Sequence, residues 1–331
     1  MPRRITSADV AREAGLSRAT VSYVLNNTPH QKIPDDTRRR VLDAANRLGY
    51  APSAAARALR SGRSDVVLCL LPDWPVGPEV GALASNLSTE LARHGLTFVL
   101  HPITAGSRPT AEIWKAITPA AVLAFQEFSA EETAAMQAAG IELVVALLGR
   151  SRSSRQGREL EVPQQRVGRL QVERLAAAGH TRLGYAYPDD VRLRNFAEPR
   201  LAGVRIACTD LGVDAPDVHV VPLDADAAAP AAAAWHAGGV SGVCAYNDEV
   251  ALAVLAGMRL HGLCAPDDLA VVGVDDIPSA RLAAPPLTTV TTDQSAVAAH
   301  LAATIVAAIA GEAGPPRPGP DIVRVIERAS V

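Results

Sequence analysis

From Val66 onward, short apolar runs alternate with longer stretches of helical character, and this alternation limits the possible fold more than any other feature. A continuous apolar run of about four to eight residues is typical of a strand that is buried on both faces. Such strands, separated by helices, indicate a parallel, doubly wound α/β sheet. Eight runs meet this description: Val66–Leu71, Thr97–Leu100, Ala121–Phe125, Leu143–Leu148, Leu183–Tyr187, Val218–Val221, Gly242–Ala245 and Leu269–Val274.

The length of the chain, 331 residues, leaves room for two such lobes after a small N-terminal head. We expect one lobe at about 64–162 with 292–319, and the other at about 163–291 with 320–331. The last strand is predicted at Ile322–Ala329. No apolar stretch approaches the roughly 18 residues of a membrane span, and no hydrophobic signal segment follows Met1. We therefore expect a cytoplasmic protein without a membrane partner.

The sequence contains no motif of a common enzyme or metal site. The four cysteines form no Cys-x-x-Cys pair, which argues against a zinc finger or a disulfide scaffold and fits a reducing cytosol. A phosphate-binding loop, a dinucleotide-binding glycine motif and a His-Glu-x-x-His motif are all absent from the sequence. We predict no catalytic residue, no metal site and no cofactor. A sugar-processing enzyme that carries a DNA-binding module is an alternative that would need such residues.

The charge of the chain is divided unevenly. Residues 1–64 contain twelve Arg or Lys and five Asp or Glu, a net charge of +7, and the remainder has a net charge of −10. A small basic head on an acidic body indicates a polyanionic partner for the head alone. The alternative is an arginine-rich face that is merely solvated.

The head has the signals of a helix-turn-helix. Thr6 and Asp9 form a capping pair at the start of one helix, which ends at Gly15. Ser17 then caps a second helix from Arg18 to about Leu25. Two short helices joined by a three-residue turn with glycine are typical of this motif. A third helix is predicted after Pro34, with an end at Gly49.

The second helix has two distinct faces. Val21, Val24 and Leu25 form its inward stripe. An arginine near the start of such a helix can donate two hydrogen bonds to guanine. A helical hairpin that packs on another surface is the alternative. The opposite, outward face carries Arg18, Ala19, Ser22, Tyr23 and Asn26.

Residues 51–63 connect the head to the body. Pro52 suits the first turn of a helix, and Ala54 to Leu59 are strong helix formers. A helix of about seven residues is shorter than the ~12–15 that are marginally stable alone in water. The segment is therefore expected to become helical only against a partner, as a switch. A passive alanine-rich spacer is the alternative.

The runs Asp9–Asn26 and Leu48–Ser53 resemble the headpiece of the lactose-repressor (LacI/GalR) family of bacterial transcription regulators, and the resemblance continues through the chain. It implies a helix-turn-helix DNA-binding domain at 1–50, a hinge helix at 51–63, and an effector-binding and dimerisation domain at 64–331. That domain would have the two-lobed fold of periplasmic binding proteins. The implied function is that of a homodimeric, sequence-specific regulator, a repressor in the first instance.

The same resemblance implies the partners and the DNA contacts. The partners are a pseudo-palindromic, double-stranded operator in the nucleoid and a small-molecule effector such as a sugar. Leu59, with Ala56 beside it, would wedge into the minor groove at the operator centre. The residues assigned to DNA are Thr6, Ser17, Arg18, Ala19, Thr20, Ser22, Tyr23, Asn26, Thr37, Pro52, Ser53, Ala56 and Leu59.

Candidate effector ligands follow the predicted strands, because ligands of open α/β sheets bind beyond the carboxyl ends of strands. The resemblance assigns Arg200 to the effector-binding arginine of the family, and Trp74 or Phe196 could supply an apolar face. A guanidinium beside a carboxylate suits the hydroxyls of a sugar or the edge of a nucleobase. For each residue, a capping or loop role is the alternative. The set is Asp73, Trp74, Arg194, Arg200, Asn247, Asp248 and Asp275.

Two positions depart from the pattern of the family. Leu147 stands at the end of the fourth strand, where relatives often have an aspartate. Gln164 stands where many relatives have an aspartate before the next helix. Both changes remove a carboxylate from the expected cleft, so an apolar ligand, or none, becomes an alternative to a simple sugar. A transport protein with a basic head is the remaining rival, and the ordered helix-turn-helix argues against it.

Overall fold

The computed structural model describes residues 5–25, 32–50, 64–104, 106–147, 159–161 and 164–331. They fall into two compact units, Met1–Asp65 and Val66–Val331, which we call the head and the body. Several residues that the sequence assigns to DNA lie outside the described residues: Asn26, Pro52, Ser53, Ala56 and Leu59.

The head consists of three helices, α1 (Ser7–Ala14), α2 (Arg18–Leu25) and α3 (Asp35–Leu48). Gly15 and Gly49 end α1 and α3 with φ values of 63° and 62°, a conformation that glycine adopts without a steric penalty. The three helices bury a small apolar core that includes Val21 and Val24, two of the inward residues predicted for the second helix, whereas the third, Leu25, is half-buried. Its members are Val10, Ala11, Ala14, Val21, Val24, Val41, Ala44 and Ala45.

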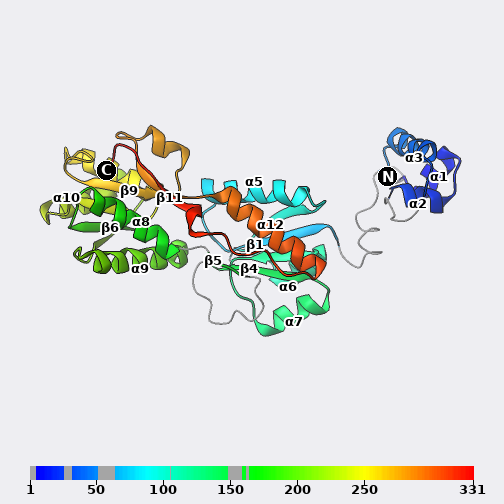
Figure 1. The fold of residues 1–331 in the computed structure, drawn as a ribbon, viewed down its shortest axis with the longest axis horizontal. Coiled ribbons are helices and arrows are strands. Elements are labelled where there is room, and N and C mark those ends of the chain that lie inside the picture. The colour runs from blue at the N-terminus through cyan, green and yellow to red at the C-terminus, as the bar shows by residue number, and fades with distance from the viewer. Residues whose placement is uncertain (1–4, 26–31, 51–63, 105, 148–158, 162–163) are drawn as a thin grey trace. The chain divides into compact units, whose positions relative to one another are not determined.

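The body contains two sheets, each covered by helices on both faces, which confirms the predicted α/β class (Figure 1). The first sheet has the strand order β2-β1-β3-β4-β5 and is parallel throughout. Its strands are β1 (Val66–Leu71), β2 (Thr97–Pro102), β3 (Ala121–Ala124), β4 (Glu142–Leu147) and β5 (Glu159–Glu161).

Helices from distant parts of the sequence cover the first sheet, and together they form the first lobe. Helices α5 (Pro78–Ala92) and α12 (Gln294–Ala310) lie side by side on one face, where Leu87, Leu91 and Leu301 pack onto β1 and β3 (Figure 1). Helices α6 (Thr110–Ile117) and α7 (Ala130–Ala138) cover the other face. The chain therefore returns to the first lobe before it adds the last strand, β11 (Val323–Ile326), to the second.

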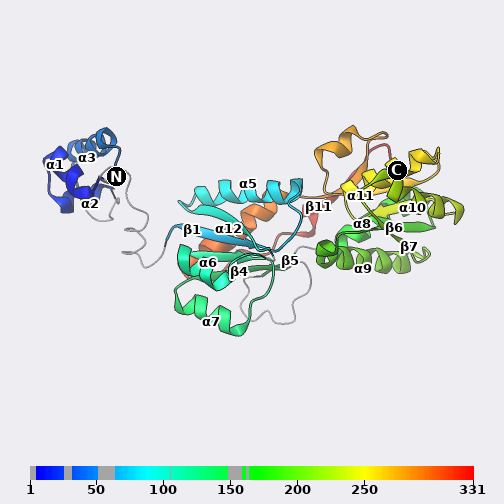
Figure 2. The ribbon, with the colours of Figure 1, turned by 180° about the vertical axis from the view of Figure 1, so that it is seen from behind.

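The second lobe has the strand order β11-β10-β9-β8-β6-β7, with only the β10–β11 pair antiparallel. Helices α8 (Gln164–Ala177) and α9 (Arg194–Leu211) pack on one face, and α10 (Ala225–Ala237) and α11 (Asp248–Leu260) pack on the other (Figure 2). Its strands are β6 (Leu183–Pro188), β7 (Asp217–Val221), β8 (Gly242–Ala245), β9 (Ala270–Val274), β10 (Thr288–Thr292) and β11 (Val323–Ile326).

All eight predicted strands are present, and none of their ends differs from the prediction by more than two residues. The sequence pattern missed β5 and β10, because Glu-Leu-Glu and Thr-Thr-Val-Thr-Thr are not apolar runs. The last strand is shorter than predicted and ends at Ile326. Among the described residues, no helix is long and apolar enough to cross a membrane.

Candidate functional site

A cavity of about 180 Å³ lies in the body, with walls from both lobes. The first lobe contributes residues after β1, the start of α5 and the start of α12. The second lobe contributes Gln164 of α8, Arg200 of α9 and the residues that follow β8 and β9. The site therefore lies at the carboxyl ends of the strands, where ligands of such sheets bind. Its polar or aromatic lining consists of Trp74, Glu79, Phe98, Phe125, Gln164, Phe196, Arg200, Tyr246, Asn247, Glu249, Asp275, Thr292 and Gln294.

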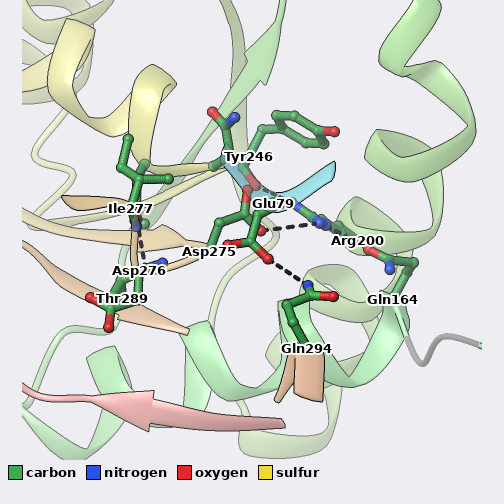
Figure 3. A network of polar contacts seen from close by, with 12 residues as sticks. Glu79, Gln164, Arg200, Tyr246, Asp275, Asp276, Ile277, Thr289 and Gln294 are labelled. Carbon is green, nitrogen blue, oxygen red and sulfur yellow. Dashed lines mark hydrogen bonds and ion pairs between the residues drawn. The ribbon is translucent and has the colours of Figure 1, made fainter. Parts of the chain in front are cut away.

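Arg200 is the centre of the polar end of this pocket (Figure 3). Its Nε donates to Oε1 of Gln164 at 2.7 Å, and its Nη1 donates to the carbonyl of Tyr246 at 2.7 Å. The guanidinium lies over the Tyr246 ring, 4.7 Å from its centroid, and Nη2 is 3.7 Å from Oδ1 of Asp275. Burial lowers the pKa of Arg200, but the Asp275 charge and its other partners raise it overall, so the guanidinium stays charged.

Close packing of α8 against α9 holds Arg200 in place. A Cβ on Gly203 would collide with the backbone carbonyl of Gln165, and a Cβ on Gly168 would collide with that of Arg200. Both positions therefore require glycine if the helices are to approach this closely. The short approach brings the Gln164 amide within reach of the Arg200 side chain. This explains why a glutamine is useful at the position where the family pattern has a carboxylate.

Asp275 lies in a strained turn directly after β9. Its φ is 108° and that of Asp276 is 53°, values that are unusual for residues other than glycine. The backbone N–H of Asp275 donates to the carbonyl of Val290 at 2.7 Å, and Asp276 forms ion pairs with Arg281 and Arg328. These contacts hold the turn so that the Asp275 carboxylate faces Arg200 (Figure 3).

Asp248 supports this turn from below and does not line the pocket. It is fully buried at the start of α11, where its carboxylate accepts from the N–H of Ile277 at 2.9 Å and from the Thr289 hydroxyl at 2.6 Å. Burial raises its pKa to about 7. The prediction of Asp248 as an effector ligand is therefore corrected: its side chain turns into the core and fixes the Asp275 turn.

Glu79, in the first turn of α5, is a functional candidate that the sequence analysis missed. Its carboxylate accepts a short hydrogen bond from the Gln294 amide and lies close to Asp275 (Figure 3). Burial, followed by the negative charge of Asp275, raises the pKa of Glu79 to about 7. The Pro-Glu pair just after a predicted strand was the only signal of this residue in the sequence.

An aromatic cluster forms another wall of the pocket. The Trp74 ring lies 5.3 Å from the Phe125 ring and 4.6 Å from the Phe196 ring, centroid to centroid. Trp74 and Phe125 come from the first lobe and Phe196 comes from α9 of the second. The cluster therefore joins the lobes through apolar contact beside the polar end.

Four of the seven predicted effector residues line the pocket: Trp74, Arg200, Asn247 and Asp275. Asp73 and Arg194 do not. Asp73 pairs with Arg192 at 3.5 Å, and Arg194 projects into solvent beside Glu198 at 3.6 Å. Position near a strand end places a residue at the right edge of the sheet but does not set the direction of its side chain. The side chain of Leu147 lies outside the described residues.

In the head, α2 presents Arg18, Ala19 and Tyr23 on an exposed face, and Ser22 is half-buried. The hydroxyls of Thr6 and Ser17 serve the helix starts. That of Thr6 donates to Asp9 at 2.6 Å, and that of Ser17 accepts from the Thr20 N–H at 3.1 Å. Thr20 also shares a hydrogen bond with Ser17 through its own hydroxyl, and Thr37 is half-buried on α3. The exposed face of α2 is therefore the part of the head best placed to contact a partner.

Two family descriptions match the chain. "Bacterial regulatory proteins, lacI family" matches residues 6–53, and "Periplasmic binding protein-like domain" matches residues 172–331. The chain is 30% identical over 330 residues to the HTH-type transcriptional regulator MalR of Streptomyces coelicolor, covering 93% of this chain and 91% of MalR. It is 29% identical over 336 residues to the regulator CelR of Thermobifida fusca, covering 95% and 94%.

Solved structures show the same architecture. The Lac repressor dimer bound to operator and the anti-inducer ONPF matches with a TM-score of 0.78 at 21% identity, covering 99% of both chains. A complex of the transcriptional regulator CelR with cellobiose matches with a TM-score of 0.65 at 25% identity, covering 99% of this chain and 100% of that chain. The relatives that match over most of their length are transcription regulators.

Proposed function

Because this chain belongs to the LacI family of bacterial regulatory proteins and is a DNA-binding transcription regulator, we propose that it is a repressor whose Arg200–Asp275 pocket sets operator affinity. The main support for this proposal is that the chain forms two separate units with different features. The head presents Arg18 and Tyr23 on an exposed helix face, and the body encloses a pocket with a charged end. A protein with both features can bind DNA with one unit and sense a small molecule with the other.

The α2 face of the head is the proposed base-reading surface. Arg18 lies in the first turn of α2, from which a guanidinium can reach O6 and N7 of a guanine in the major groove. Ala19 and Tyr23 share that face. Thr6, Ser17, Thr20, Ser22 and Thr37 are proposed to position the head on the phosphates, since backbone N–H groups at helix starts favour anions.

Residues 51–63 are proposed to couple the two units. This part of the proposal rests on the sequence, because the segment lies outside the described residues. A short helix that forms only on DNA would respond to both the operator and the pocket. Coupling between two sites requires such a shared two-state element.

The protein is proposed to act as a homodimer, as the Lac repressor does in its operator complex. The second lobe supports this with an open apolar groove whose lining includes Leu223, Leu252, Ala253 and Ala256. Leu223 in this lining is 65% exposed, and Leu282, four residues after the lining residue Pro278, is 85% exposed. Large exposed apolar side chains beside a groove are typical of a protein–protein interface. A second copy would also supply the second head that a pseudo-palindromic operator needs.

We further propose that the protein is not an enzyme and that it acts in the cytoplasm, with the nucleoid. Two observations support the first point. Asp275 pairs with Arg200 and Asp248 is hydrogen-bonded to the strained turn, and the described residues contain no cluster of His, Cys, Asp and Glu suited to a metal ion. The second point follows from a DNA-binding function in a bacterium.

The test begins with selection of operator sequences from a random DNA library by the full-length protein. The selected duplex and a scrambled duplex are then titrated at two salt concentrations. A regulator binds the selected duplex with an affinity ~10³-fold or more above that of the scrambled one, and both affinities fall with salt. Equal affinities for the two duplexes would refute the proposal.

A further inference from the structure

The pocket has an excess of negative charge. The charged side chains that line it, within the described residues, are three carboxylates, Glu79, Glu249 and Asp275, and one guanidinium, Arg200. Glu249 is exposed, whereas Glu79 is half-buried. An acidic lining favours a cation over a carboxylate or phosphate.

Arg200 is largely committed to the protein. Its Nε and Nη1 donate to Gln164 and to the Tyr246 carbonyl, and Nη2 faces Asp275 at 3.7 Å. Arg200 and Asp275 therefore compensate each other, and little of the guanidinium remains to attract an anionic ligand. The ion pair is a fixed wall of the site.

Within the described part of the chain, Glu79 forms no ion pair of its own, and the charge of Arg200 offsets only part of the effect of burial and of Asp275 on its pKa. Its carboxylate accepts a hydrogen bond from the neutral amide of Gln294, and its charged neighbours in the second lobe include Asp275 and Asp276 as well as Arg200. A carboxylate that is half-buried beside another carboxylate is costly unless a cation or a proton joins it. Figure 3 shows the Glu79 side chain directed toward the Arg200–Asp275 pair from the first lobe. A ligand cation would therefore bridge the lobes at this point.

The aromatic cluster supplies the second half of the recognition chemistry. Trp74, Phe125 and Phe196 line the same pocket, with ring centroids 4.6–5.3 Å apart in the two contacting pairs. Leu71, Leu83 and Leu100 extend the apolar lining into the first lobe. Aromatic faces attract cations, and the apolar lining favours a hydrophobic body.

We propose that the effector is an amphipathic organic amine: its ammonium lies between Glu79 and Asp275, and its apolar or aromatic body packs on Trp74, Phe196 and the leucines of the first lobe. This inference rests on the proposed function only in taking the pocket as the effector site.

The proposal predicts a dependence of affinity on pH. Glu79 has a pKa of about 7 because of burial and Asp275, and Asp276, Arg200 and Glu249 are the other charged groups that face it. An alkyl ammonium has a pKa near 10 and stays charged between pH 6 and 8. The amine binds the ionised form of Glu79, whose fraction rises from about a tenth at pH 6 to about nine tenths at pH 8. The affinity should therefore rise about tenfold over this range.

The experiment uses the full-length protein and three probes with the same body: phenylbutylamine, phenylbutanol and phenylbutyrate. Their affinities are measured by calorimetry at pH 6 and pH 8. We expect the amine to bind at least tenfold more tightly than the other two at pH 8 and to lose about tenfold at pH 6. Equal binding of the alcohol, or tighter binding of the carboxylate, would overturn the proposal.

The variant Glu79→Gln removes the charge and keeps the hydrogen-bonding shape. It should bind the amine at least tenfold more weakly, with no pH dependence, and should bind the alcohol as before, which also shows that it is folded. Glu90→Gln is the matched control, because Glu90 lies on the same helix and pairs with Arg93 outside the pocket. A pH dependence that persists in Glu79→Gln would overturn the assignment to this residue.

Two outcomes separate this proposal from the proposed function. Binding of the amine without any effect on operator affinity supports the ligand class and refutes the regulatory role of the pocket. Binding of cellobiose, the ligand in the CelR complex, with a change in operator affinity and no binding of the amine, would overturn the ligand class alone.

Discussion

The head and the body use charged side chains in opposite ways. In the described part of the head, no charged side chain is buried, and arginines such as Arg12 and Arg39 reach into solvent beside local carboxylates. In the body, Arg200 and Asp248 are buried and carry several hydrogen bonds each. A charged side chain in the head is therefore available to a partner, whereas a buried charged side chain in the body supports the fold. Substitution of a charged residue in the head should change binding with little effect on stability. Substitution of a buried charged residue in the body should change both.

The largest effect should come from Arg200→Ala. Removal of the guanidinium leaves Asp275, Gln164 and the Tyr246 carbonyl without their partner in a buried site, and loss of one half of a buried ion pair costs about 3–5 kcal/mol. We expect urea unfolding of the body to shift by this amount and the response to effector to disappear. The control is Arg194→Ala on the same helix, where the side chain is 74% exposed and a change within about 0.5 kcal/mol is expected. Equal shifts for the two variants would mean that Arg200 has no special place in the fold.

The second largest effect should be a loss of DNA binding on substitution of Arg18 in the head. Arg18→Ala should weaken binding to the selected operator by about 1–3 kcal/mol and relax the preference at one base pair in each half-site, with little change in stability. Arg39→Ala, an exposed arginine of α3, is the control that should weaken specific and random DNA alike. The measurement is a titration of the operator and of single-base variants. If Arg18→Ala lost the same factor on random DNA, Arg18 would be a phosphate contact.

The sequence predicts the structure of the head more fully than it predicts the pocket of the body. The caps at Thr6–Asp9 and Ser17 and the helix ends at Gly15 and Gly49 agree with the prediction, because each depends on neighbours within a few residues. The pocket depends on residues that are far apart. Asn247 and Asp248 are adjacent in sequence, yet one lines the pocket and the other is buried beneath it.

Glu79 was missed because its hydrogen-bond partner is far away in the sequence. It lies on α5 and reaches the site because α12, more than 200 positions later, supplies Gln294 beside it. No local pattern indicates that contact. The strands β5 and β10 were missed for a related reason. β5 is a short edge strand, and the buried Thr288 and Thr289 of β10 donate their hydroxyls to partners far away in the sequence, the Arg328 carbonyl and Asp248.

A third prediction concerns pH and the body alone. Burial raises the pKa of Asp248 to about 7 in the folded state, above the value of about 4 expected in the unfolded chain. Between these values the folded state holds a proton that the unfolded state has lost, so stability should fall as pH rises from about 4 to 7 and then level off.

The variant Asp248→Asn tests this sign. An amide can still accept from the Ile277 N–H and can donate to the Thr289 hydroxyl. The variant should therefore lose less stability than the unsubstituted protein as pH rises, and its body should be more stable by about 1 kcal/mol at pH 8. The measurement is urea unfolding at several pH values. A stability that rises between pH 4 and 7 in the unsubstituted protein would show that the sign is wrong.

The smallest expected effect is a loss of stability in the head. Ser17→Ala removes the hydroxyl that accepts from the Thr20 N–H at the start of α2, and loss of such a cap costs about 1 kcal/mol. We expect the unfolding transition of the head to shift by this amount while that of the body stays in place, as two calorimetric transitions would show. A matching shift in the body would contradict the separation into two units.

The central claim is that the head recognises the operator and the body sets its affinity through the pocket. The most direct measurement is the operator Kd for the unsubstituted protein, Arg18→Ala and Glu79→Gln, without phenylbutylamine and with it at one concentration about equal to its Kd for the unsubstituted protein. We expect Arg18→Ala to weaken both operator Kd values by one factor and to keep their ratio. Glu79→Gln should keep the amine-free Kd and move the ratio toward one, because weaker binding leaves fewer pockets occupied at that concentration. The contrary result would be a ratio that changes in Arg18→Ala and is unaffected in Glu79→Gln.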